Sequence, residues 1–342
     1  MLRFRMKLNY PDWLKQIVVP GAFVIDEHSI AGISGGKTSA LMAFLLDLHN
    51  PNDERLVFSF QNTGREHEKT YEFLNNLQQY LTRPIIWLEY QKPANYGAPP
   101  KESRTRIVDF DTADRTGKPF SDLLQALAEY RDFEKSLGPI APNPTQRLCT
   151  AYLKMRTCDK YVQTLKWECY TRVAGLRADE PKRVARYGTK DTQEITSSTP
   201  LSTSNITNEH VKQFWSEQPF TLDIPENLGN CTLCFLKDEA DLAFNMYYES
   251  SPEETQWWLE MQEKYGQFGR GTSYRQLLEE APVRWMIREA VATNKTMTCP
   301  ANFPPYRFKL LVRQEQRVAK LGIQRTPCSC EAAEHITDEQ LL

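Results

Sequence analysis

The chain has 342 residues and contains no apolar run that approaches the ~20 residues of a membrane-spanning helix. It shows no internal repeat and no low-complexity segment, and its ordinary composition excludes a disordered chain, a collagen repeat and a coiled coil. No secretory leader is recognisable, because the short apolar stretch 17–25 is broken by Pro20 and Gly21. We therefore expect a cytoplasmic protein with no membrane partner.

Neither sign of charge is in excess, since 42 Lys and Arg residues face 44 Asp and Glu residues. Whole-molecule charge therefore predicts neither nucleic-acid nor membrane binding, although a local patch can hide in the average. The length exceeds the usual ~100–200 residues of one domain, which favours a main domain with a smaller companion.

Short apolar runs alternate with amphipathic stretches from Ser29 onward, the pattern of strands and covering helices in a parallel sheet. The fold class we expect is α/β, a parallel sheet with helices on both faces, followed by a mostly helical C-terminal region. The expected strands are 29–33, 55–60, 84–90 and 169–174, and the expected helices are 37–48, 66–81, 121–135, 149–166 and 208–217.

This pattern divides the chain into four expected parts. They are a helical N-terminal extension at 1–28, an α/β domain at 29–186, a linker with a Cys-x-x-Cys pair at 187–237, and a helical domain with a Cys-x-Cys tail at 238–342. Two segments are expected to lack regular structure. The polar, Pro-containing stretch 91–119 is too long for a standard connection and predicts a functional loop or a mobile insert, and 187–206 reads as a Ser/Thr-rich linker.

The densest motif is Ser34-Gly-Gly-Lys-Thr-Ser39, placed between a predicted strand and a predicted helix. At such a junction, backbone N–H groups and the helix N-terminus together bind phosphate. The motif is not a Walker loop, because Gly32 leaves three residues instead of four before the Gly36-Lys37 pair. It predicts a phosphate site of a different kind.

This loop resembles the SGGxxS loop of the N-type ATP pyrophosphatases and of the phosphoadenosine-phosphosulfate (PAPS) reductase family, which share the adenine nucleotide alpha hydrolase-like fold. Three later segments match the family in order. Asn62-Thr63-Gly64 resembles Asp-Thr-Gly, with Asn in place of Asp; Arg147-Leu-Cys-Thr to Lys154 resembles Arg-x-Cys-Cys-x-x-x-Lys; and Gly175-Leu-Arg177 resembles a further phosphate-contacting signature. The matches lie within residues 29–234.

The resemblance implies ATP and Mg²⁺ as ligands and catalytic roles for Lys37, Lys154 and Arg177. It implies nucleotide binding by a larger set: Gly32, Ser34, Gly35, Gly36, Lys37, Thr38, Ser39, Asn62, Thr63, Gly64, Arg147, Gly175, Arg177 and Arg183.

Eight cysteines are present, and Cys231-Thr-Leu-Cys234 has the spacing with which two thiolates bind one metal or cluster iron. In adenylylsulfate reductases of the family, a Cys-Cys pair and a later Cys-x-x-Cys hold a [4Fe-4S] cluster. Here the first pair is Cys149-Thr150, so the resemblance implies Cys149, Cys231 and Cys234, with Cys330 or alternatively Cys328 as the fourth ligand. A Zn²⁺ site is the competing interpretation. Cys158, Cys169 and Cys299 are expected in the core.

Lys309, Arg313 and Arg317 recur at four-residue spacing on a predicted helix, a row that can contact DNA or RNA phosphates or simply face solvent. The chain also lacks the C-terminal Glu-Cys-Gly-(Ile/Leu)-His motif that carries the nucleophile of PAPS reductases. The combination resembles the DNA phosphorothioation ATP pyrophosphatases (DndC-like and SspD-like) and phage PAPS reductase-like proteins.

The expectation is therefore an ATP pyrophosphatase that adenylates a substrate for sulfur transfer in DNA phosphorothioation, a phage-defence DNA modification. A cysteine desulfurase would be the sulfur donor, with other modification-complex subunits as possible partners. The alternatives are a PAPS or adenylylsulfate reductase, a tRNA thiolation enzyme, and a non-catalytic nucleotide- or DNA-binding subunit.

Overall fold

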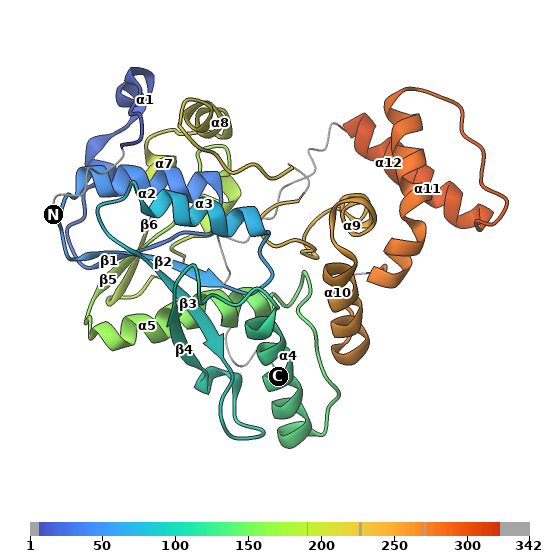
Figure 1. Ribbon diagram of the computed structural model, residues 1–342, viewed down its shortest axis with the longest axis horizontal. Coiled ribbons are helices and arrows are strands. Elements are labelled where there is room, and N and C mark those ends of the chain that lie inside the picture. The colour runs from blue at the N-terminus through green and yellow to red at the C-terminus, as the bar shows by residue number, and fades with distance from the viewer. Residues whose placement is uncertain (1–6, 190, 226–227, 270, 322–342) are drawn as a thin grey trace. The chain divides into compact units, whose positions relative to one another are not determined.

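The structure, a computed structural model, describes residues 7–189, 191–225, 228–269 and 271–321 (Figure 1). These residues separate into two compact units. The first comprises the described residues up to 139 together with 146–224, and the second comprises 140–145 together with 225–321. Each unit is described by itself below.

The first unit contains a six-stranded sheet in the order β4-β3-β2-β1-β5-β6. All neighbouring strands are parallel except β3 and β4, which are antiparallel. The strands are β1 (Ser29–Gly32), β2 (Leu56–Asn62), β3 (Ile85–Gln91), β4 (Arg104–Val108), β5 (Tyr170–Val173) and β6 (Ile195–Ser198). The expected α/β class with a largely parallel sheet is confirmed.

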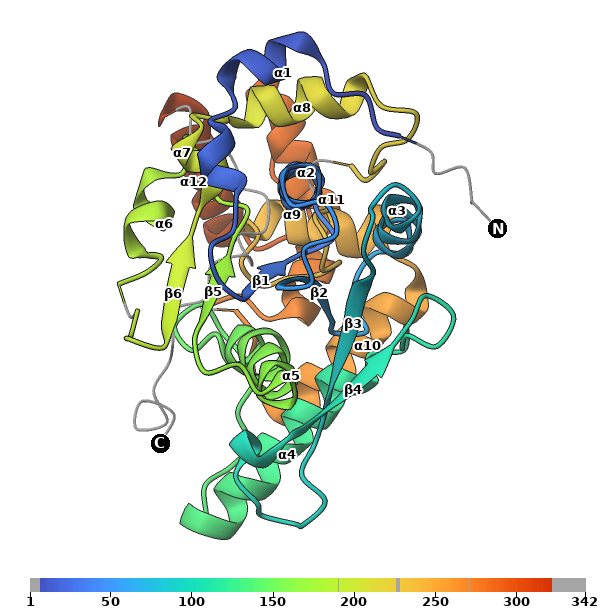
Figure 2. The ribbon, with the colours of Figure 1, turned by 90° about the vertical axis from the view of Figure 1, so that its left-hand side faces the viewer.

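Helices cover both faces of this sheet, with α2 and α3 on one face and α4 and α5 on the other (Figures 1 and 2). The helical elements of the unit are α1 (Asp12–Ile17), η1 (Pro20–Phe23), α2 (Lys37–His49), α3 (Glu68–Gln78), η2 (Pro100–Glu102), α4 (Lys118–Lys135), η3 (Thr150–Arg156), α5 (Thr157–Leu165), α6 (Pro181–Arg186), α7 (Pro200–Thr203) and α8 (Asn208–Ser216). Of these, η3 is a π-helix that continues directly into α5.

The core explains why α2 is apolar around most of its circumference. One side of α2 packs on the sheet, while the other side packs on α8, where the rings of Phe44 and Phe214 lie 5.4 Å apart. Strand β2 is a nearly continuous apolar run because a parallel sheet with helices on both faces is buried on both faces. Together these layers fix the segment between β1 and α2, which carries the predicted phosphate loop.

Two segments expected to be irregular instead join the sheet. Residues 91–119 include β4, and residues 187–206 include β6 and α7, so the sheet continues beyond residue 186, the expected end of the α/β domain. Both strands are edge strands whose residues are mostly polar and half-buried or exposed, and edge strands lack the apolar signature of buried ones. Thr171 and Thr196, whose hydroxyl oxygens lie 2.7 Å apart, pair side by side on β5 and β6.

The second unit is helical, as expected, and its elements are α9 (Glu239–Phe244), η4 (Asn245–Glu249), α10 (Pro252–Tyr265), α11 (Tyr274–Ala292) and α12 (Pro305–Leu321). Ile287 of α11 packs with Phe308 and Leu311 of α12 in a small core. A bidentate ion pair joins the same two helices, since Arg307 donates to both carboxylate oxygens of Glu280 at 2.7 and 3.0 Å. No helix in the described ranges is long and apolar enough to cross a membrane.

Candidate nucleotide site

The strand order reverses beside β1, because the chain runs from β1 to β2 and β3 on one side and returns with β5 on the other. In open parallel sheets, ligands bind outside the carboxyl ends of the strands at such a point. A pocket with an empty volume of about 740 Å³, part of it open solvent, lies at this place. Four predicted site residues line it: Gly32, Ser34, Lys154 and Gly175.

The loop that follows β1 is held by its own hydroxyl groups. The backbone N–H of Ser34 donates to Ser39 Oγ at 3.1 Å, and Ser39 Oγ donates to the carbonyl of Gly36 at 3.1 Å. Gly35 adopts a φ of +83°, and a Cβ there would lie 2.4 Å from Thr70 Cγ2, so a side chain does not fit. Gly36, the N-cap residue of α2, has no side chain to cap the helix, which leaves the positive end of the helix dipole at the loop.

The Gly175 loop, which follows β5, lies against this loop. A Cβ on Gly175 would be 3.0 Å from Ser39 Cα, so the two backbones approach closely. Arg177 donates from Nη1 to Thr38 Oγ1 at 3.2 Å and from Nε to Asp179 at 2.9 Å. Two motifs 139 residues apart in the sequence are thus joined by one side-chain contact, and a guanidinium is fixed at the N-terminus of α2.

Lys154 reaches the same pocket from η3, whose π-helical turn places it with Thr150 and Met155 among the lining residues. Short π-helical segments are frequent at functional sites. Lys37, Arg147 and Arg183 do not belong to the lining. Lys37 is held through its carbonyl, which accepts from Trp215 Nε1 at 2.7 Å, and Arg183 forms an ion pair with Glu180.

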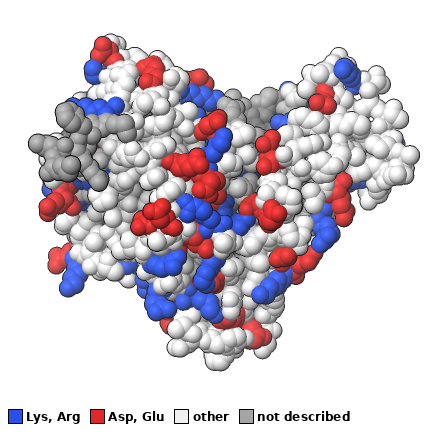
Figure 3. Space-filling model, viewed as in Figure 1, with Lys and Arg blue, Asp and Glu red and all other residues white. Residues whose placement is uncertain are grey.

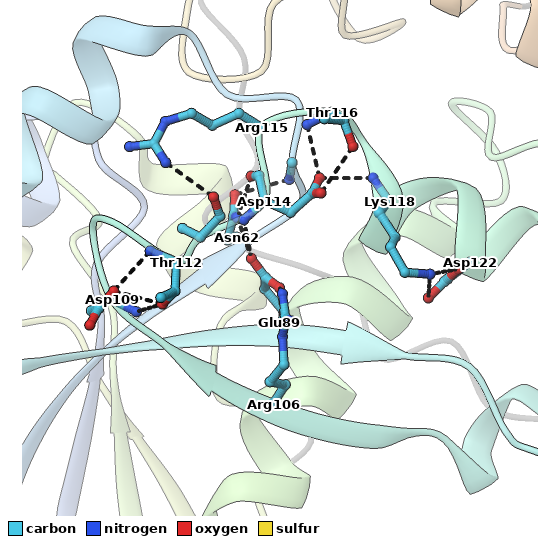
Figure 4. Close-up of polar contacts among 12 residues, drawn as sticks. Asn62, Glu89, Arg106, Asp109, Thr112, Asp114, Arg115, Thr116, Lys118 and Asp122 are labelled. Atoms are coloured by element: carbon cyan, nitrogen blue, oxygen red, sulfur yellow. Dashed lines mark hydrogen bonds and ion pairs between the residues drawn. The ribbon is translucent and has the colours of Figure 1, made fainter.

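Asn62 occupies a different environment from the one expected for a nucleotide ligand. Its side chain is fully buried, and its Nδ2 donates to Glu89 Oε1 at 2.7 Å and to the carbonyl of Asp114 at 2.8 Å (Figure 4). Its Oδ1 accepts from the Gly64 N–H and from the Tyr71 hydroxyl, both at 2.9 Å. These four bonds use the full hydrogen-bonding capacity of the amide.

The environment of Glu89 favours an amide over a carboxylate at position 62. The Glu89 carboxylate is buried, and it accepts from Asn62, from the backbone N–H of Asp114 and from Arg106. An aspartate at position 62 would place a second carboxylate at hydrogen-bonding distance from the first. Asn62 therefore positions the loop around Asp114, and neither it nor its neighbours Thr63 and Gly64 line the pocket. The Thr63 hydroxyl donates a hydrogen bond to the Glu66 carboxylate at 2.8 Å.

The pocket also contains residues that were not predicted as site residues, among them Cys158, which was expected in the core. They are Gln61, Cys158, Asp159, Arg172 and Tyr187, together with apolar neighbours from β1 and β5. Arg172 donates to Asp159 at 2.7 Å and to the Tyr170 hydroxyl at 3.1 Å, and the Tyr187 hydroxyl donates to the Arg172 carbonyl. Burial raises the pKa of the Cys158 thiol to about 12, which keeps it protonated and unreactive. The signal in the sequence that could have revealed this part of the pocket is Arg172, a charged residue within the short interior strand β5.

The five cysteines predicted as metal ligands fall into three groups. Cys149 lies in the first unit, Cys231 and Cys234 lie in the second unit, and Cys328 and Cys330 lie outside the described residues. Within the described ranges, no three His, Cys, Asp or Glu side chains are grouped so that they could hold a metal ion. The four-cysteine ligand set therefore stays a prediction. Cys169, expected in the core, is exposed because it precedes the first residue of β5.

The basic row on α12 is exposed. Lys309, Arg313 and Arg317 face away from the buried side of the helix, which carries Phe308 and Leu311. Arg307, in contrast, is engaged by Glu280. On the face drawn in Figure 3, Lys and Arg side chains lie among Asp and Glu side chains, as the balanced composition suggests.

No protein-family model matches the chain. The chain is 29% identical over 211 residues to the uncharacterized nin region protein ORF290 of Escherichia phage lambda. The match covers 61% of this chain and 66% of that protein, just under two thirds of its length. The chain is thus a distant homologue of that phage protein, and the relationship adds no activity.

Proposed function

We propose that the chain binds ATP with Mg²⁺ at the carboxyl ends of β1 and β5 and cleaves it between the α- and β-phosphates to adenylate an acceptor. The observation that carries this proposal is the convergence of three separate motifs. Ser34 and Lys154 line one pocket, and Arg177 contacts the adjoining loop through Thr38.

Each motif has a physical role in this reaction. The uncapped N-terminus of α2 and the hydroxyls of the Ser34–Ser39 loop would hold the β- and γ-phosphates. Arg177, fixed on Thr38 and Asp179, and Lys154 would stabilise the negative charge that grows around the α-phosphorus. Mg²⁺ would arrive with ATP as part of the substrate.

The proposed cleavage of ATP is an in-line displacement at the α-phosphorus. An acceptor oxygen forms a bond to the α-phosphorus while the bond from that phosphorus to the bridging oxygen breaks, and pyrophosphate leaves with the electron pair. The acceptor then carries AMP. In a following step, the terminal sulfur of a cysteine desulfurase persulfide would form a bond to the acceptor as AMP leaves with the electron pair of the broken bond. A thiol reductant would then cleave the resulting disulfide, so that the sulfur stays on the acceptor and the desulfurase cysteine is released as a thiol.

A nucleic-acid acceptor, most specifically a DNA backbone phosphate, is supported by the exposed row Lys309, Arg313 and Arg317 on α12. That row belongs to the second unit, so the acceptor proposal and the ATP-cleavage proposal rest on different residues. Neither proposal involves the expected [4Fe-4S] cluster or its expected fourth ligand, Cys330 or Cys328.

Product analysis with ATP labelled at the α- or γ-phosphate tests this function, with and without DNA or tRNA. We expect AMP and pyrophosphate, with DNA increasing turnover more than tRNA does. ADP and phosphate would overturn the proposal, and a greater stimulation by tRNA would redirect it to RNA. Sulfite release from PAPS with thioredoxin, without ATP cleavage, would establish a reductase. Nucleotide binding with no product would establish a non-catalytic subunit.

A further inference from the structure

Five exposed residues of α12 lie in line along one side of the helix. Tyr306, Lys309, Arg313, Arg317 and Lys320 follow one another at spacings of three, four, four and three residues. At about 3.6 residues per turn, these spacings place all five side chains within an arc of about 80° and along about 21 Å of the helix. We call these five residues the outer stripe.

The opposite side of α12 is occupied by contacts within the second unit. Phe308 and Leu311 pack there with Ile287 of α11. Glu315 is the one acidic residue of the sequence between positions 305 and 321, and the same helical geometry places it on this inner side. The outer stripe therefore carries four cationic side chains and no carboxylate.

The four cations of the outer stripe are accessible to a ligand. All four side chains are exposed, and within the described residues no ion pair neutralises any of them. Arg317 also borders a groove that is lined by Asp238 and Glu239, so its surroundings are more negative than those of Lys309 and Arg313. The stripe thus presents a positive surface to a polyanion, and we expect Arg317 to contribute less to it than its neighbours.

The packing of α12 distinguishes between two polyanions, a nucleic-acid strand and an anionic membrane surface. A helix that lies on a membrane buries an apolar face among the lipids. The apolar side of α12 is already buried in the second unit, where Phe308 and Leu311 are 7% and 4% exposed. The phosphates of a nucleic acid need only the cations of the stripe. The arrangement therefore favours a nucleic acid.

Tyr306 indicates which form of nucleic acid fits the outer stripe. Its ring is 77% exposed and lies about one turn before Lys309, at the N-terminal end of the stripe. Aromatic rings beside a basic track stack on the bases of single strands, whose faces are open. The bases of a duplex stack on one another and present only their edges in the grooves. An exposed ring in line with four cations therefore fits unpaired bases.

We propose that the outer stripe binds a single-stranded segment of nucleic acid, with the phosphates on its four cations and one unpaired base stacked on Tyr306. This inference rests on the nucleic-acid acceptor of the proposed function, and it narrows that acceptor to a strand that is unpaired where α12 contacts it. The stripe lies in the second unit and shares no residue with the nucleotide pocket of the first.

The test measures binding of the full-length protein, without ATP, to short fluorescein-labelled strands. The probes are a thymidine strand, a uridine strand, a duplex of the same length and a deoxyribose-phosphate strand without bases. Both strands with bases should bind more tightly than the duplex. The strand without bases should bind roughly 5–150-fold more weakly than the thymidine strand, the effect of losing one stacked base.

Two kinds of variant separate stacking from charge. Tyr306→Leu should bind the thymidine strand as weakly as the unaltered protein binds the strand without bases, and it should bind the latter no more weakly still. Tyr306→Phe should bind normally, because it keeps the ring. Lys309→Met and Arg313→Met should each reduce the slope of log affinity against log salt concentration by about 0.7, whereas Tyr306→Leu should leave this slope unchanged.

The matched controls are exposed residues of the second unit that lie outside α12. Tyr247→Leu and Lys264→Met should bind every probe like the unaltered protein. Equal losses in Tyr306→Leu and Tyr247→Leu would overturn the proposal, as would tighter binding to the duplex than to either strand. Binding to phosphatidylserine vesicles without binding to any strand would replace it with a membrane surface.

A parallel measurement of AMP and pyrophosphate production by the unaltered protein keeps the two proposals apart. Products without strand binding would refute the outer stripe alone, and strand binding without products would refute ATP cleavage alone.

Discussion

Asn62 donates a 2.7 Å hydrogen bond to the buried carboxylate of Glu89, which also accepts from the N–H of Asp114. This pairing fixes the loop between β4 and α4 to the end of β2. It depends on an amide at position 62, because a carboxylate cannot donate to Glu89. The amide at position 62 is therefore matched by a carboxylate on the neighbouring strand β3.

Asn62→Asp should destabilise the protein by about 1–3 kcal/mol, the cost of leaving buried polar groups without partners. Adding Glu89→Gln to that variant should recover part of this loss, since the glutamine amide can donate to the carboxylate introduced at position 62. Urea denaturation of the two single variants and the double variant measures the coupling. Additive losses would show that the Asn62–Glu89 contact does not determine the residue at 62.

Gly32→Val should obstruct the pocket without harming the fold. A Cβ at Gly32 meets no atom within 4 Å, and Gly32 lines the pocket, so added methyl groups enter empty space. We expect ATP affinity to fall by about tenfold or more, with the unfolding midpoint nearly unchanged. Gly21→Ala is the control, because its Cβ also meets no atom within 4 Å but Gly21 lies outside the pocket. Undiminished ATP binding in Gly32→Val would place the nucleotide elsewhere.

Arg177→Met should reduce the rate of ATP cleavage by roughly 10²–10³-fold, the usual effect of removing one preorganised charge-stabilising group. Lys182→Met, an exposed lysine on α6, should cleave ATP at the normal rate. Single-turnover rates at saturating ATP separate this effect from weaker binding. An equal and small loss in both variants would remove Arg177 from the proposed site.

Lowering the pH should destabilise the second unit by protonating Glu280. Although burial acts to raise its pKa, hydrogen bonds from Arg307, Gln276 and Arg284 outweigh burial and hold the pKa of Glu280 below its usual 4.5. A carboxyl with a depressed pKa contributes stability that is present above pH 4.5 and is lost as the pH falls through the folded-state pKa. Unfolding measured from pH 6 downward should show this loss begin near pH 4.5 and grow as the pH falls below that value.

Glu280→Gln provides the comparison for that measurement. It should be less stable than the unaltered protein at pH 6, because the bidentate pair with Arg307 is lost, and the two stability curves should converge at low pH. Parallel curves over the whole range would assign the acid sensitivity to other carboxyl groups.

Local patterns were sufficient for the framework of the first unit. The strand and helix around Ser34–Ser39 and the strand that leads to Gly175 are found where the apolar periodicity predicts them. These elements are buried on well-defined faces, so the order of apolar and polar residues along each element reflects which of its positions are buried. The edge strands β4 and β6 were missed because their exposed polar side chains resemble those of loops.

The amino-acid order alone thus specified the α/β class, the loop after β1 and the helical second unit, because each depends on contacts between near neighbours in the chain. Only the tertiary structure shows three other features. Arg177 contacts Thr38, Asn62 donates to Glu89, and Arg172 lines the pocket. Parallel strand pairing brings together carboxyl ends that are far apart in sequence, and no local pattern encodes which side chains meet there.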